Sequence, residues 1–94
     1  DGGTPLLGAA LVNSRPCVEL LLRHGADPSI RNNKGRTALH VAAEAGAADT
    51  VKLLLDAGAE VNTRDDAGLT PLAIALQQGH EDVAQLLRQH GGTE

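Results

Sequence analysis

The apolar positions of this chain fall in short blocks that are separated by glycine and polar residues. Three blocks contain adjacent leucines and are followed three residues later by a glycine; they are Leu20-Leu21-Leu22, Leu53-Leu54-Leu55 and Leu86-Leu87-Arg88. Adjacent leucines give a helix an apolar stripe, and a glycine just past the last turn favours its end. The pattern therefore predicts three helices, over roughly 16–24, 49–57 and 82–90.

A second set of helices is predicted in front of these three. Threonine followed by proline, at Thr4-Pro5 and Thr70-Pro71, is typical of an N-cap and a first helical position. Gly46 and Gly79 are placed to end the helices in a left-handed conformation, and Asn13 takes that place near the start of the chain. Each stretch therefore has the order helix, turn, helix, loop.

The same order returns every 33 residues, because Thr4-Pro5-Leu6, Thr37-Ala38-Leu39 and Thr70-Pro71-Leu72 are related by that step. We predict three units, at approximately 1–31, 32–64 and 65–94, with β-hairpin-like loops over about 28–36 and 61–69. One helix pair cannot bury both of its faces, but three stacked pairs can. The expected fold is an all-α solenoid of helix-turn-helix units.

Composition and charge narrow the function. The chain has no aromatic residue and no methionine, which excludes RNA recognition by stacked aromatic side chains and suits closely packed helices. A net charge of −4 gives no basic footprint for direct nucleic-acid binding. No apolar run is long enough to insert in a membrane. Cys17 is the only cysteine, which favours an intracellular location, cytoplasmic or nuclear, and we expect it to be buried as a small apolar residue.

The repeats resemble the ankyrin family. The run Thr37-Ala38-Leu39-His40-Val41-Ala42 is similar to that family's T-P-L-H-x-A pattern, and the similarity continues through Gly58-Ala59-Glu60-Val61-Asn62 and Asp65. The resemblance covers all three units. It implies a non-catalytic module that binds proteins, and it gives His40 a structural role in tying neighbouring loops together.

The departures from the family pattern concern the two ends. Leu7 stands where the pattern has histidine, and Arg88 stands in place of a third leucine. A polar residue on a terminal helix suits a face in contact with solvent, so we interpret 70–94 as the C-terminal end of an array. More repeats are plausible upstream, which makes the chain a probable fragment of a larger protein.

No catalytic, cofactor-binding or metal-binding residue is expected. None of the four histidines forms the i, i+4 pair of a helical metal site, and no threonine or serine has a predicted base beside it. The chain is therefore not predicted to be an enzyme.

The resemblance places partner binding on the loop tips and on the concave side of the first helices. The residues carried over to those positions are Leu11, Val12, Arg31, Asn33, Lys34, Arg36, Glu44, Ala45, Arg64, Asp66, Leu69, Gln77 and Gln78. Three of them, Arg31, Lys34 and Arg36, form a basic lip. We expect a protein or peptide partner with an acidic group near Arg31 and Arg36 and an apolar or aromatic anchor.

Two functions remain open. The first is a binding module within a multidomain adaptor or regulator. The alternative is a structural segment that caps a longer array or mediates self-association.

Overall fold

The computed structural model describes residue 8 and residues 15–94 of the 94-residue chain, and the structural statements below concern that part. Its helices are α2 (Arg15–Arg23), α3 (Ala38–Ala45), α4 (Ala48–Asp56), α5 (Pro71–Gln77) and α6 (Glu81–Gln89). The expected N-cap at Thr4, the cap at Asn13 and the departure at Leu7 lie outside the described residues. Each of α2, α4 and α6 begins and ends one residue earlier than predicted.

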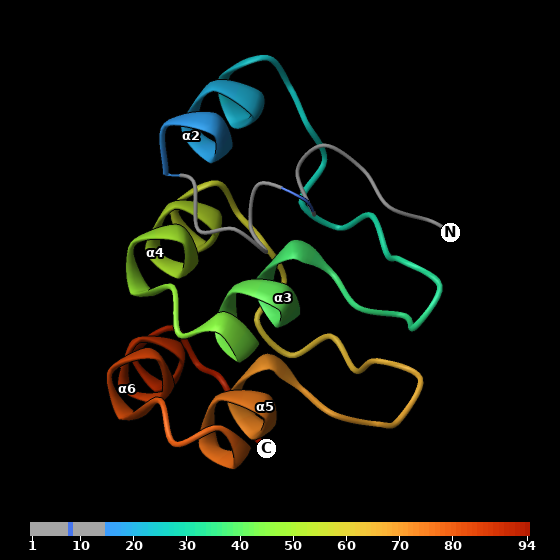
Figure 1. Ribbon diagram of the computed structural model, residues 1–94, viewed down its shortest axis with the longest axis vertical. Helices are drawn as coiled ribbons and strands as arrows, with labels where there is room; N and C mark the ends of the chain where they lie inside the picture. The colour runs from blue at the N-terminus through green and yellow to red at the C-terminus, as the bar shows by residue number, and fades with distance from the viewer. Residues whose placement is uncertain (1–7, 9–14) are drawn as a thin grey trace.

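The helices form two layers (Figure 1). The second helices of the units, α2, α4 and α6, stack in one layer, and α3 packs against α5 in the other. The loops that precede α3 and α5 project from the same side of the stack. The prediction of an all-α solenoid of helix-turn-helix units is confirmed. No helix in the described part is long and apolar enough to cross a membrane.

The helix ends are set as the sequence predicts. The Thr70 hydroxyl accepts a hydrogen bond from the Ala73 N–H (3.2 Å), with Pro71 in the first turn. Gly46 follows α3 with a φ of 71°, and the next N–H, that of Ala47, returns to the Ala42 carbonyl at 3.0 Å. This bond satisfies a carbonyl at the end of the helix and turns the chain sharply into α4.

The core is built from small and aliphatic side chains. Ala42 in α3 and Ala75 in α5 occupy equivalent positions 33 residues apart, and both are fully buried. Their side chains end at Cβ, so the two helices can approach closely without leaving a void. Leu54 and Leu87, also 33 apart and fully buried, occupy equivalent positions in α4 and α6.

One expectation about the core is wrong. Cys17 is exposed, whereas its equivalents Thr50 and Val83 are buried. The difference follows from position in the stack: α4 packs against α2, and α6 packs against α4, whereas no described helix lies on the outer side of α2.

We expect Ala42→Leu to lower the free energy of unfolding by about 1–3 kcal/mol, because three added carbons overpack the contact between α3 and α5. Urea denaturation followed by circular dichroism measures this. Ala45→Leu is the matched control on the exposed end of the same helix and should change stability by less than about 0.5 kcal/mol. Equal effects of the two substitutions would show that the helices are not closely packed.

Candidate partner-binding surface

The expected binding residues lie on two neighbouring loops and on the exposed sides of α3 and α5 (Figure 1). Those that are exposed are Arg31, Asn33, Lys34, Glu44, Ala45, Arg64, Asp66, Gln77 and Gln78. Arg36 and Leu69 are half-buried. Leu11 and Val12 lie outside the described residues, so the apolar strip expected there stays a prediction.

Each loop is held by one side chain at the same position of its unit. The Asn32 side-chain oxygen accepts hydrogen bonds from the N–H groups of Lys34 (2.9 Å) and Arg36 (3.0 Å). Thirty-three residues later, Oδ1 of Asp65 accepts from Ala67 and Leu69, both at 2.9 Å. Asparagine and aspartate are favoured in turns because their side chains can imitate a backbone acceptor in this way.

The two loops also bond to each other. The Asp66 N–H donates to the Lys34 carbonyl at 3.0 Å. Gly35, with a φ of 73°, lies against this contact, and a Cβ added there would come within 2.9 Å of the Asp66 nitrogen. Glycine is therefore required at position 35 both by its left-handed backbone and by the closeness of the next loop.

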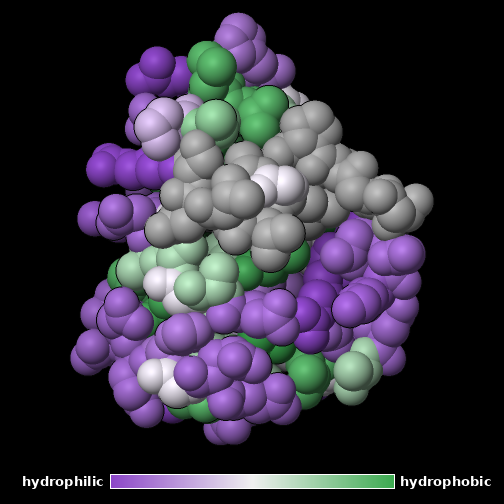
Figure 2. Space-filling view, viewed as in Figure 1, coloured by the Kyte–Doolittle hydropathy of each residue, from purple (hydrophilic) through white to green (hydrophobic). Residues whose placement is uncertain are grey.

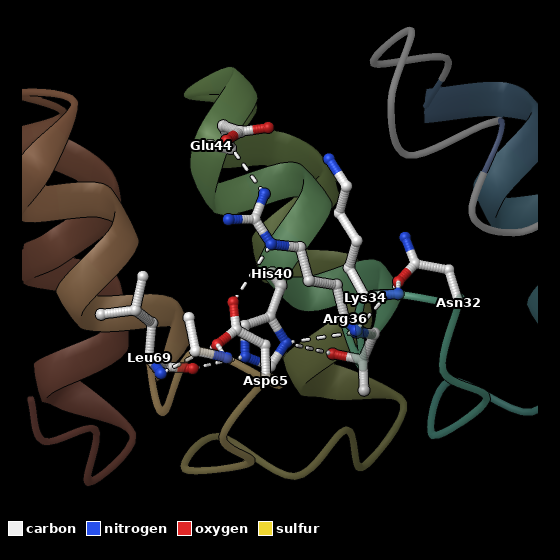
Figure 3. Close-up of polar contacts among 9 residues, drawn as sticks. Asn32, Lys34, Arg36, His40, Glu44, Asp65 and Leu69 are labelled. Atoms are coloured by element: carbon white, nitrogen blue, oxygen red, sulfur yellow. Dashed lines mark hydrogen bonds and ion pairs between the residues drawn. The ribbon is translucent and has the colours of Figure 1, made fainter.

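Arg36 and two carboxylates form a cluster that joins the units (Figure 3). Its Nε donates to Oδ2 of Asp65 at 3.1 Å, and its Nη1 donates to Oε2 of Glu44 at 2.9 Å. The Asp65 side chain is only 2% exposed, whereas those of Arg36 and Glu44 are 20% and 45% exposed. Asp65 thus bonds its own loop through one oxygen and the preceding unit through the other.

The expectation that Arg36 presents a free, exposed charge is therefore wrong. A nearly buried carboxylate needs a compensating cation, and Arg36 is the side chain that supplies it. Burial raises the pKa of Asp65, but the hydrogen bonds from Leu69, Arg36 and Ala67 outweigh that effect and lower the pKa below its usual value. Of the basic lip, Arg31 and Lys34 are exposed, and neither forms an ion pair with a residue that the structure describes.

His40 ties the loops of the second and third units together, as predicted. Its Nε2 lies 2.9 Å from the Leu69 carbonyl, which can only accept, so the proton is on Nε2. Nδ1 then accepts from Thr37, whose N–H lies at 3.2 Å and whose hydroxyl lies at 3.0 Å. Burial lowers the pKa of His40 and outweighs the opposing effect of the Leu69 carbonyl, so the imidazole stays neutral.

A second histidine bridges the same units at another place and was not foreseen. His80, at the start of α6, has its Nε2 3.1 Å from the Glu44 carbonyl in the last turn of α3. Its ring lies over Gly46, where an added Cβ would come within 2.8 Å of it. A histidine after a glycine gives no sequence signal for this contact, because the partner carbonyl is 36 residues away.

The chain belongs to the ankyrin repeat family: the family's three-copy pattern matches residues 6–94. Ankyrin repeats are a non-catalytic helical fold that generally binds other proteins. Within the described part of the chain, no group of three histidine, cysteine or acidic residues could hold a metal ion.

Three relatives show how far the similarity reaches. The human 2-5A-dependent ribonuclease is 50% identical over 46 residues, which are 49% of this chain and 6% of that protein. The mouse NF-kappa-B inhibitor delta is 51% identical over 45 residues, 48% of this chain and 14% of that protein. Protein lin-12 of Caenorhabditis elegans is 49% identical over 43 residues, 46% of this chain and 3% of that protein. The chain thus spans a small part of each relative's length.

We expect Asp65→Asn to lower the free energy of unfolding by about 1–3 kcal/mol, because Arg36 loses a charge-assisted hydrogen bond inside the cluster. Asp66→Asn removes the same charge from the next, exposed position and should cost less than about 0.5 kcal/mol. Urea denaturation at pH 7 compares the two. A loss as large in Asp66→Asn would mean that the overall charge, and not the cluster, sets the effect.

Stability should fall as the pH drops below about 6.5, the ordinary pKa of histidine, because the unfolded chain then binds a proton that folded His40 resists. A second loss should begin near pH 3.8, where the unfolded form of Asp65 takes up a proton before the folded form does. Denaturation midpoints between pH 7.5 and 5 test the first step. His40→Gln should flatten it, whereas His24→Gln, at an exposed position, should leave it in place.

Proposed function

We propose that the chain binds a protein or peptide partner through the loops at 31–36 and 64–69 and the exposed sides of α3 and α5. The observation that carries this proposal is the contrast between the two sides of the loops. Their inner side is held by Asn32, Asp65, Arg36 and His40, whereas their outer side chains are exposed. A surface that is already ordered loses little conformational entropy when it binds.

The charges on this surface favour a partner with an acidic group. Arg31 and Lys34 are exposed cations on one loop, and the carboxylates of Asp65 and Glu44 are already occupied by Arg36. We therefore place the partner's acidic group at Arg31 and Lys34, and no longer at Arg36. Such charges act mainly on the association rate and on selectivity.

The middle of the surface favours an apolar anchor. Ala45 is exposed at the end of α3, and Leu69 is half-buried at the start of the α5 unit. The chain has no aromatic residue, so a large ring in this position comes from the partner. Gln77 and Gln78, exposed at the end of α5, offer hydrogen bonds and no charge.

The partner surface is tested with peptides selected against this chain from a display library. We expect them to combine carboxylates with an apolar residue, and Arg31→Glu with Lys34→Glu together to weaken their binding at least tenfold and to reduce its salt dependence. Lys52→Glu on the exposed side of α4 is the matched charge reversal and should leave binding unchanged. Equal weakening by both reversals, or none by either, contradicts the proposed surface.

The wider setting belongs to the proposal as well. We place the module inside the cell, within a larger adaptor or regulator, which fits the single cysteine and the small share of each relative that the chain spans. The ribonuclease activity in one relative's name concerns that protein, and we propose no catalytic activity for residues 1–94. The alternative structural role is favoured by one observation, the uncovered side of α2.

A further inference from the structure

The first stacked helix, α2, has one side that is exposed although its residues are apolar. Leu20 is 55% exposed, whereas its equivalents Leu53 and Leu86 are half-buried. Cys17, one turn earlier on the same side, is exposed where Thr50 and Val83 are buried. Figure 2 shows hydrophobic atoms at the surface over α2.

This exposure does not come from a poorly seated helix. Val18, between the two exposed residues in sequence, is 0% exposed, as are its equivalents Val51 and Ala84. The opposite side of α2 packs on α4 in the same way as α4 packs on α6. Exposure is therefore concentrated on the side that, in α4 and α6, is covered by the preceding helix of the stack.

The other end of the stack is different. At the position where α4 has the buried Leu55, α6 has Arg88, whose side chain is exposed. A charged residue there suits contact with water, whereas cysteine and leucine on α2 do not require it. The two ends thus have opposite chemistry, and only the α2 end retains the residue types of an internal interface.

We propose that the outer face of α2, formed by Cys17 and Leu20, is a stacking interface for a further helix-turn-helix unit of the same polypeptide. The occupant follows from continuity with the interfaces between α2 and α4 and between α4 and α6, where a helix of the preceding unit covers the equivalent positions. The inference rests on the exposure of these columns, not on where the sequence begins, and it is independent of the proposed partner surface.

The test adds such a unit and asks whether it covers the face. A copy of residues 34–66 placed directly before residue 1 keeps the 33-residue step, since residue 67 is the equivalent of residue 1. We expect Cys17 to react with iodoacetamide at least tenfold more slowly in the extended chain than in the 94-residue chain. The urea midpoint should rise at the same time.

Leu20→Glu distinguishes stacking from simple attachment. In the 94-residue chain this substitution should change the urea midpoint little, because Leu20 is mostly exposed. In the extended chain it should remove the gain in stability and restore the reactivity of Cys17. Gln85→Glu, an exposed position on α6, introduces the same group and should do neither.

Two results would overturn the proposal. The first is an unchanged Cys17 reaction rate in an extended chain that circular dichroism shows to be fully helical. The second is a 94-residue chain that sediments as a dimer with Cys17 protected, and becomes monomeric and reactive as Leu20→Glu; the occupant would then be a second copy. Either result leaves the partner surface on the loops to be judged by its own experiment.

Discussion

The nearly buried carboxylate of Asp65 is the point at which the loop structure and the stacking of units depend on each other. One of its oxygens orders the backbone of its own loop, and the other binds Arg36 of the preceding unit. His40 makes a parallel link to the Leu69 carbonyl at the end of the same loop. Loop order and unit-to-unit contact are therefore one arrangement, and a change that disturbs either one disturbs the other.

This arrangement complements an apolar interface that carries little shape information. Alanine side chains such as Ala42 and Ala75 allow close contact between helices, but small, similar side chains discriminate weakly between neighbouring registers. Directional bonds from Arg36 and His40 each have a defined partner in the next unit. We infer that apolar burial supplies most of the attraction between units and that the polar links select the register.

The fold could be predicted from the sequence because its determinants are local and repeated. The step of 33 residues, the glycines that end helices and the threonine caps act within a few residues of where they stand, and α2, α4 and α6 lie within one residue of their predicted bounds. The state of Arg36 could not be predicted in this way, because its partner Asp65 is 29 residues distant and only the stacking geometry brings them together. The exposure of Cys17 depends on what covers α2, which a repeat pattern within the chain does not state.

The contact between Gly46 and His80 has a consequence for how this pair of positions can vary. The imidazole fills the space that a side chain at 46 would need, and the glycine's positive φ disfavours such a side chain independently. A larger residue at 46 would have to displace the ring and break its bond to the Glu44 carbonyl. A smaller residue at 80 would leave that carbonyl to water and open a gap above the turn. Among natural variants of these two units, the residues at 46 and 80 should therefore change together, one gaining volume as the other loses it.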